Sequence, residues 1–302
     1  SGLRLRNGVA PVELISGLLP SAEGLETGRI EAPLVLLSPP RSGSTLLFEL
    51  LAQAPGLYSI GGESHQVFEG LEELSGRARG SNRLDRSDAD PGLLAALRAR
   101  FFLRARDRDG VFSEPGQRLR LLEKTPKNCL RVPFLEPLFE GQARYLLLWR
   151  EPRQVLASML AGWRAGAFQT YARLPDRSGP WSFLLPPGWQ GHDGGLAERV
   201  VWQWRQALET AVRDLGDLPA ERVRVLRYED LVARPEDCAR RACAWAELDW
   251  DRPVGALPLS GNTLTPPHPD KWRLSERELS PMLSEVDRVA AGFLTWASGR
   301  WL

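Results

Sequence analysis

Residues 33–47 read PLVLLSPPRSGSTLL. The first six, PLVLLS, form a short apolar run without polar alternation, which is typical of a strand buried on both faces of a parallel sheet. From residue 44 onward the leucines recur at helical spacing, and prolines, an arginine and a glycine lie between the two patterns. We therefore expect a buried strand, a tight loop and a helix over 44–54.

Similar apolar runs recur along the chain, and helical patterns separate them. Further strands are predicted at 57–60, 118–123, 144–149 and 222–227, and further helices at 93–106, 127–139, 152–164, 195–215 and 235–246. Strands that alternate with helices predict an α/β fold, here a P-loop-like three-layer sandwich with a mostly parallel central sheet. Ligands of such sheets bind at the carboxyl ends of the strands. We expect residues 1–302 to form a single domain.

Two segments have no clear strand or helix period. Residues 76–93 are polar and rich in turn formers, so we expect a surface connection there. Residues 165–195 are rich in proline and aromatic residues, and long irregular segments of this kind are often lids or binding loops. Trp181, Phe183 and Trp189 argue against disorder. A lid over a binding site and a packing cap over the core are both open interpretations.

The composition excludes several classes of protein. Lys and Arg total 39 against 38 Asp and Glu, so we expect no nucleic-acid-binding surface. The cysteines, Cys129, Cys238 and Cys243, lack metal-ligand spacing, which favours reduced thiols over structural zinc. No apolar run approaches the ~20 residues that span a bilayer, and no signal peptide is recognisable. We expect a cytoplasmic protein without a membrane segment. The Ser-Gly start suggests either a trimmed chain or a domain excised from a longer chain.

The loop after the first buried strand has the features of an anion site. Backbone N–H groups at a helix N-terminus and the helix dipole both favour negative charge. Gly43 allows close approach of the backbone, Ser42, Ser44 and Thr45 offer hydroxyl donors, and Arg41 supplies a cationic fork. These residues predict a phosphate or sulfate site. The alternative is ordinary helix capping beside a surface arginine.

The predicted strand ends add positive charge. Lys124, Arg150 and Arg227 end their strands, and no strand ends in the aspartate that would help to hold Mg²⁺. The pattern Gly-x-x-x-x-Gly-Lys-Ser/Thr of nucleotide triphosphatases is also missing. The sequence therefore predicts direct anion binding with no metal required. A metal-dependent P-loop kinase and a noncatalytic nucleotide-binding module stay as alternatives.

Residues 40–47, PRSGSTLL, resemble the 5′-phosphosulfate loop of sulfotransferases that use 3′-phosphoadenosine 5′-phosphosulfate (PAPS). In that family a strand ends in an arginine, a serine follows eight residues later, and the two bind the 3′-phosphate; Arg150 and Ser158 match this spacing. The resemblance is to bacterial members, which are similar to tyrosyl-protein and carbohydrate sulfotransferases and to sulfotransferase domains of polyketide synthases. Taken alone, Arg150 could be a helix-entry cation and Ser158 an interior helix serine.

Two weaker matches follow in the family's order. Residues 227–231, RYEDL, resemble the segment whose tyrosine approaches the adenine, which implies that role for Tyr228. Residues 270–272, DKW, resemble a basic-aromatic segment that closes over the nucleotide, which implies that Lys271 contacts it. A core tyrosine and a solvated lysine are the alternatives.

The resemblance also implies catalytic groups. Related sulfotransferases place a carboxylate after the second strand, where this chain has Glu63, and His65 is the alternative base because an imidazole's ordinary pKa is ~6.5. We favour Glu63. Lys124, in a Lys-Thr-Pro setting like that of the tyrosyl members, would stabilise the transferring oxygens together with Arg41.

The acceptor is expected to be a hydroxyl on a hydrophobic small molecule or on a polyketide-like chain tethered to an acyl carrier. Segment 165–195, with Trp163, would form its apolar wall. His192 and His268 lie in Pro- and Gly-rich stretches, and we expect both to be exposed. The product of the donor would be PAP, the desulfated nucleotide.

Overall fold

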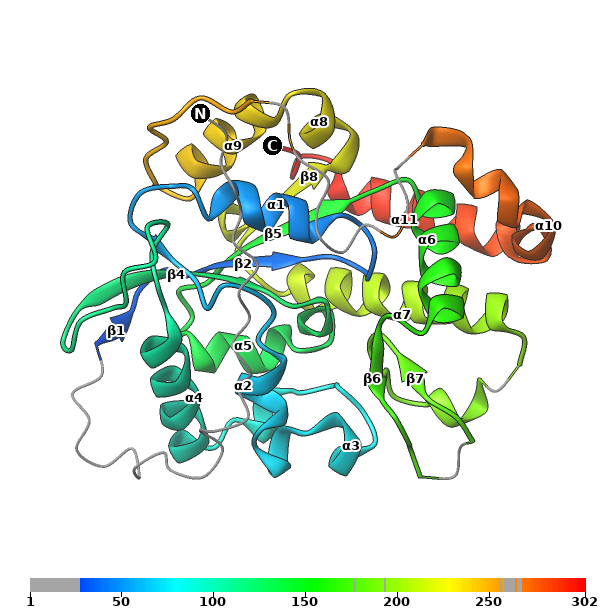
Figure 1. The fold of residues 1–302 in the computed structure, drawn as a ribbon, viewed down its shortest axis with the longest axis horizontal. Helices are drawn as coiled ribbons and strands as arrows, with labels where there is room; N and C mark the ends of the chain where they lie inside the picture. Colours follow the sequence, from blue (N-terminus) through cyan, green and yellow to red (C-terminus); the bar gives the residue numbers. More distant parts are fainter. Residues whose placement is uncertain (1–27, 176–177, 193, 256, 258–263, 265–267) are drawn as a thin grey trace.

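A six-stranded sheet, in which every pair of neighbouring strands is parallel, lies at the centre of the computed structural model (Figure 1). The structure describes residues 28–175, 178–192, 194–255, 257, 264 and 268–302. The strand order is β1-β4-β2-β5-β8, and β3 also pairs with β4. The strands are β1 Arg29–Ile30, β2 Leu34–Leu37, β3 Leu57–Tyr58, β4 Arg118–Lys124, β5 Arg144–Trp149 and β8 Val223–Arg227.

Helices cover both faces of this sheet. They are α1 Ser44–Leu51, α2 His65–Glu69, α3 Gly76–Arg79, α4 Pro91–Arg104, α5 Val132–Leu138, α6 Pro152–Ala165, α7 Leu196–Gly216, α8 Tyr228–Ala233, α9 Pro235–Trp245, α10 Glu276–Leu279 and α11 Leu283–Ala297. Successive side chains of a strand point to opposite faces, and β2 follows this rule. Leu34 and Leu36 pack in the core under α1 and α9, whereas Val35 and Leu37 pack in the larger core under α4, α5, α7 and α11. The predicted three-layer α/β sandwich is confirmed.

The helix predicted over 127–139 is in fact two pieces. A 3₁₀ turn, η3 (Pro126–Leu130), is separated from α5 by Arg131, whose φ of −130° is not helical. Pro133 then lies in the first turn of α5, where its missing N–H costs nothing. The break turns the Arg131 guanidinium into the core, where Nε donates to the carbonyl of Asn82 at 3.3 Å.

Segment 76–93 was predicted to be a surface connection, and this is wrong for its middle part. Asn82 and Leu84 are fully buried. The Asn82 side chain accepts a hydrogen bond from the Leu185 amide at 2.6 Å and donates one to the Tyr171 hydroxyl at 2.6 Å. The polar composition concealed an inward turn, because the buried amide is satisfied by a segment about a hundred residues away.

Segment 165–195 contains a short antiparallel hairpin, β6 (Gln169–Tyr171) and β7 (Trp181–Ser182), which lies beside α6 and α7 in Figure 1. Trp181 and Trp189 are buried in an apolar cluster with Trp202. The segment therefore caps the core, as one of the two interpretations expected. Phe168, Thr170 and Leu184 of this segment line a cavity described below.

Two expectations from composition can be compared with the fold. Cys129, Cys238 and Cys243 are free thiols, and all three are buried. In the part of the chain that the structure describes, no helix combines the length and apolar character that crossing a bilayer requires.

The sheet order places the candidate site. Strand β2 lies between β4 and β5, so the segments that leave these three strands emerge at one edge of the sheet. The loop to α1 follows β2, Lys124 ends β4, and Arg150 follows β5. A crevice between neighbouring strands whose connections run to opposite faces is the usual ligand site in such sheets.

We expect Phe293→Ala to lower the free energy of unfolding by about 3–5 kcal/mol, since it removes a buried ring from a well-packed core. The Phe293 ring of α11 stacks on Trp149 of β5, with centroids 4.2 Å apart. Urea denaturation of both variants measures the difference. The control is Leu294→Ala, because Leu294 is 41% exposed against 3% for Phe293. Equal losses for the two variants would contradict the packing described here.

Candidate active site

A cavity of about 1370 Å³ opens at the carboxyl edge of the sheet. The loop after β2, the start of α2, α6, the β6–β7 hairpin and the 3₁₀ turn η6 (Pro269–Ser275) all contribute to its wall. Pockets for a single small ligand usually measure ~300–1,000 Å³. This cavity has room for two reactants.

The loop between β2 and α1 presents the helix N-terminus to the cavity. Gly43 is the N-cap residue, with a φ of 99°, and no side chain of the described residues caps this helix end. Arg41 also has a left-handed backbone, with a φ of 68°, which is strained for a residue other than glycine. Ordinary capping by Ser44 or Thr45 is therefore the wrong interpretation of this loop. Arg41, Gly43, Ser44 and Thr45 line the cavity, whereas Ser42 is buried outside its lining.

Close packing joins this loop to the ends of β5 and β8. A Cβ atom on Gly43 would lie 2.5 Å from the Tyr228 ring, so only glycine fits here. The other partner of that ring is Arg150, whose guanidinium carbon lies 4.2 Å from the ring centroid. Tyr228 is half-buried and lines the cavity, so it combines a packing role with an exposed ring surface.

Three cations meet at this end of the cavity. Arg150 Nη1 donates to the Arg41 carbonyl at 3.4 Å, and Lys271 reaches the same region from η6. Burial lowers the pKa of Lys271, and the charges of Arg150 and Arg41 lower it further. Burial and then Arg150 lower the pKa of Arg41, although Glu63 acts in the opposite sense. The charges of Arg41 and Arg150 thus act on Lys271, and a bound anion would relieve this repulsion.

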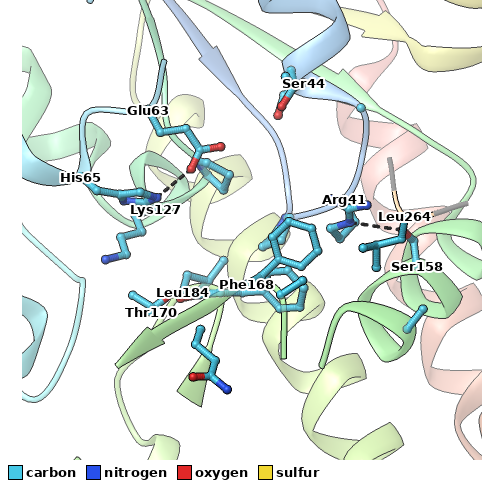
Figure 2. Close-up of a pocket in the computed structure, with 18 of the residues that line it drawn as sticks. Arg41, Ser44, Glu63, His65, Lys127, Ser158, Phe168, Thr170, Leu184 and Leu264 are labelled. Carbon is cyan, nitrogen blue, oxygen red and sulfur yellow. Dashed lines mark hydrogen bonds and ion pairs between the residues drawn. The ribbon is translucent and has the colours of Figure 1, made fainter. Parts of the chain in front are cut away.

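Ser158 lies in the same cavity as Arg150, as predicted, but its hydrogen-bond partner is a different arginine. Arg41 Nε donates to Ser158 Oγ at 3.3 Å (Figure 2). Arg150 instead donates to the Gln154 side chain, at 3.0 Å from Nη2. Both Arg150 and Ser158 line the cavity, so the two matched residues do share one site.

Glu63 lies between two basic groups, Lys124 and His65, and Figure 2 shows its contact with His65. Its Oε1 accepts from Lys124 Nζ at 2.7 Å, and its Oε2 is 2.7 Å from His65 Nε2. Burial alone would raise the pKa of Glu63, but the hydrogen bond with His65 and the charge of Lys124 outweigh it and lower the pKa to about 2. Glu63 is therefore a carboxylate at every physiological pH.

His65 and Lys124 differ in their access to the cavity. His65 lines it, but Nδ1 is buried and has no hydrogen-bond partner among the residues described. The Lys124 side chain is 3% exposed and lies behind Glu63 and Thr45, whose Oγ1 accepts from Nζ at 3.3 Å. Lys124 thus connects the loop between β2 and α1, through Thr45, to the Glu63 carboxylate.

Sequence reasoning missed a second charged group in the cavity wall, formed by Lys127, Glu69 and Tyr171. Lys127 Nζ is 2.5 Å from Glu69 Oε1 and 3.2 Å from the Tyr171 hydroxyl. Burial lowers the pKa of Lys127 to about 8, although Glu69 opposes this shift. Lys127 follows Lys124 by one 3₁₀ turn, and its partners come from α2 and from β6. No local pattern could have shown that these segments meet.

The two remaining histidines differ from each other. His268 is exposed, as expected. His192 was also expected to be exposed, and this is wrong, because its ring stacks on Trp202 with centroids 4.1 Å apart. Burial, and then Arg205, lower the pKa of His192.

A family model described as "Sulfotransferase family" matches residues 33–252, which include the anion loop, Glu63, Lys124 and Arg150. The chain belongs to the sulfotransferase family. Nodulation protein NoeE of Sinorhizobium fredii is 30% identical over 234 residues, which cover 71% of this chain and 49% of that protein. The chain thus spans about half the length of the curated relative that it matches.

One solved sulfotransferase supports the fold. STF9 from Mycobacterium avium aligns with a TM-score of 0.53 and 16% identity, over 86% of this chain and 76% of that one. The sulfotransferase domain from the curacin biosynthetic pathway aligns with a TM-score of 0.42 and 18% identity, over 84% of this chain and 99% of that one.

Family membership bears on the alternatives that the sequence left open. It favours a sulfotransferase enzyme over a metal-dependent kinase. Among the described residues of this sulfotransferase, no group of three or more His, Cys, Asp or Glu is arranged to hold a metal ion.

We expect Gly43→Ala to destabilise this sulfotransferase more than Gly56→Ala does. Both glycines have a positive φ, 99° and 75°, so both substitutions carry the backbone strain of an alanine in this region. Only Gly43 has the Tyr228 ring within 2.5 Å of a new Cβ, whereas nothing lies within 4 Å at Gly56. Thermal unfolding of the two variants isolates the clash. Equal shifts in Tm would show that the loop does not pack on Tyr228.

Proposed function

We propose that this sulfotransferase transfers a sulfuryl group from PAPS to a hydroxyl of an acceptor that has an apolar segment. The observation that carries the proposal is the meeting of Arg41, Arg150 and Lys271 at the N-terminus of α1, in a cavity that also exposes Glu63. A nucleotide with phosphates at two positions has the negative charge that fits such a group of cations.

The residues present fit this donor. The loop residues Arg41 to Thr45 would hold the 5′-phosphosulfate, since a helix N-terminus and a guanidinium both favour sulfate and phosphate oxygens. Arg150, with Lys271, would hold the 3′-phosphate, and the Tyr228 ring would contact the adenine. PAPS supplies the activated sulfuryl group, whose bond to the 5′-phosphate is a mixed anhydride.

The reaction proposed is a direct displacement. The acceptor oxygen forms a bond to sulfur while the bond from sulfur to the bridging phosphate oxygen breaks, and PAP leaves with that electron pair. Positioning and charge stabilisation dominate such transfers. Arg41 and Lys124 would neutralise the transferring and bridging oxygens, and the acceptor's proton would pass to the base.

The geometry favours Glu63 over His65 as that base. The Glu63 carboxylate lines the cavity. Of the two ring nitrogens of His65, Nε2 already contacts the Glu63 carboxylate, and Nδ1 is buried. His65 would then orient the carboxylate. A pKa of about 2 makes Glu63 a weak base while Lys124 and His65 both contact it, so its basicity depends on those contacts.

The apolar segment of the acceptor would lie on the β6–β7 side of the cavity. Phe168, Phe183 and Leu184 line this wall, and Figure 2 shows Phe168, Thr170 and Leu184 near one another there. We propose segment 165–195 as the acceptor lid. The acceptor class then includes hydrophobic small-molecule alcohols and hydroxyacyl chains tethered to a carrier. Because Lys271 lies beyond the matched range of 33–252 and yet lines the same cavity, we propose residues 1–302 as one domain.

We expect Arg150→Ala to weaken PAP binding by about 10- to 100-fold, because a hydrogen bond to a charged group contributes ~1.5–3 kcal/mol. Isothermal titration calorimetry with PAP measures the change. The control is Arg227→Ala, which removes an exposed arginine at the end of the neighbouring strand β8, outside the cavity lining. Unchanged PAP affinity in Arg150→Ala would remove Arg150 from the donor site.

We expect Glu63→Gln to keep PAP affinity within about threefold while it lowers turnover by ~10²–10⁴-fold, the usual contribution of a general base. Transfer of labelled sulfate from PAPS to a panel of alcohols, including carrier-bound hydroxyacyl chains, measures turnover. Exposed Glu72→Gln is the control. If Glu63→Gln stays active, His65 takes the role of base.

The pH profile of kcat/KM separates the same two bases. With Glu63 as base, no loss of rate from its protonation is expected between about pH 8 and about pH 5, since its pKa of about 2 keeps it ionised. A fall in rate toward acid pH that disappears in His65→Gln would instead identify the imidazole.

A further inference from the structure

A second group of cations lies in the cavity wall, apart from the donor site. Arg77 of α3 and Arg100 and Arg104 of α4 all line the same cavity. Figure 1 shows α3 and α4 away from α1 and α6, the helices that follow the donor loop and Arg150. The proposed donor chemistry uses none of these three arginines.

Unlike Arg79 and many other described arginines, these three have no acidic partner among the described residues. Within the described ranges, no carboxylate lies at ion-pair distance from any of the three. Arg79, on the same helix as Arg77, pairs with Asp88 at 2.6 Å. Glu69, an acidic residue of the same wall, is engaged by Lys127.

The backbone holds Arg100 and Arg104 in place. Arg100 Nη1 donates to the Val67 carbonyl at 3.3 Å, and Arg104 Nη1 donates to the Arg100 carbonyl at 3.2 Å. A Cβ atom on Gly70 would lie 3.0 Å from Arg100 Nη1, so the glycine leaves room for this guanidinium. Each guanidinium has five N–H donors, and these contacts use few of them. Burial, and then the charge of Arg104, lower the pKa of Arg100, which agrees with two like charges held side by side.

The length of the helix α2 sets the approximate separation of Arg100 from the proposed base, Glu63. His65, in contact with Glu63, begins α2, and Gly70, in contact with Arg100, follows its last residue. Five residues of helix rise by about 8 Å. An acceptor whose hydroxyl lies at Glu63 can therefore reach Arg100 with a group about 8 Å or more away.

We propose that the acceptor carries an anionic group, a carboxylate or a phosphate, that binds Arg77, Arg100 and Arg104 while its apolar segment lies against the β6–β7 wall. This deepens the proposed function and rests on it for the place of the reacting hydroxyl. Guanidinium pairs bind both kinds of anion in bidentate geometry, so carboxylate and phosphate are both fitting partners. The acceptor is then amphipathic, and its charge and its hydroxyl lie at opposite ends.

The test measures binding to the full chain saturated with PAP, so that the donor site is filled. Three ligands of matched length are compared by calorimetry: 8-hydroxyoctanoate, 8-hydroxyoctyl phosphate and the neutral 1,8-octanediol. The wild type is expected to bind at least one anion about 10-fold or more tightly than the diol. The carboxylate and phosphate arms show which anion is preferred.

The double variant Arg100→Gln/Arg104→Gln should abolish the preference for the anionic ligands over the diol and leave PAP affinity unchanged. Arg106→Gln, which changes an exposed arginine outside the cavity lining, should keep it. Arg77→Gln, at an exposed position, is a second variant that should fold in any case and should reduce the preference.

The proposal is overturned if the diol binds as well as both anions, if neither anion binds, or if the preference survives in the double variant. Failure of the proposed donor is a separate result, since PAP titrated alone would then not bind the wild type. In that case, the difference in anion affinity between the wild type and the double variant still tests whether Arg100 and Arg104 bind the anion.

Discussion

Repulsion between like charges at one edge of the sheet is the constraint on which the site depends. Arg41, Arg150 and Lys271 are held near one another although burial and mutual repulsion lower the pKa of Arg41 and Lys271. The packing of Gly43 against Tyr228, and of Tyr228 against Arg150, holds two of these segments together. An anion that binds only the folded state relieves the repulsion, so ligand binding and stability are linked.

The sequence was informative where the site is local. The loop after β2, the strand that ends before Arg150 and the eight-residue step to Ser158 each lie within one strand–turn–helix unit. Their spacing carried the family resemblance, which implied that they share a site, and the loop, Arg150 and Ser158 all line one cavity. The partner of Ser158 was not local. Ser158 meets Arg41 because β2 and β5 are neighbours in the sheet, which no spacing along the chain contains.

The part of the site that could not be predicted depends on contacts between distant segments. Lys127 meets Glu69 and Tyr171 only because η3, α2 and β6 converge, and Asn82 turns inward to the same hydroxyl. Composition described segment 76–93 as polar, which is correct, but the buried Asn82 amide within it is satisfied inside the protein. Local patterns predict elements well, and they cannot predict which buried polar groups will find one another.

The choice between Glu63 and His65 shows why ordinary pKa values are a poor guide to a base. Compared as isolated groups, the imidazole is better matched to neutral pH, but in the structure the two side chains and Lys124 act as one unit. Lys124 also donates to Thr45 of the donor loop. An anion on that loop attracts the same ammonium, and any weakening of its contact with Glu63 raises the pKa of the carboxylate toward its ordinary value. In the proposed reaction, donor binding would therefore make Glu63 more basic at the moment when the acceptor's proton must be removed.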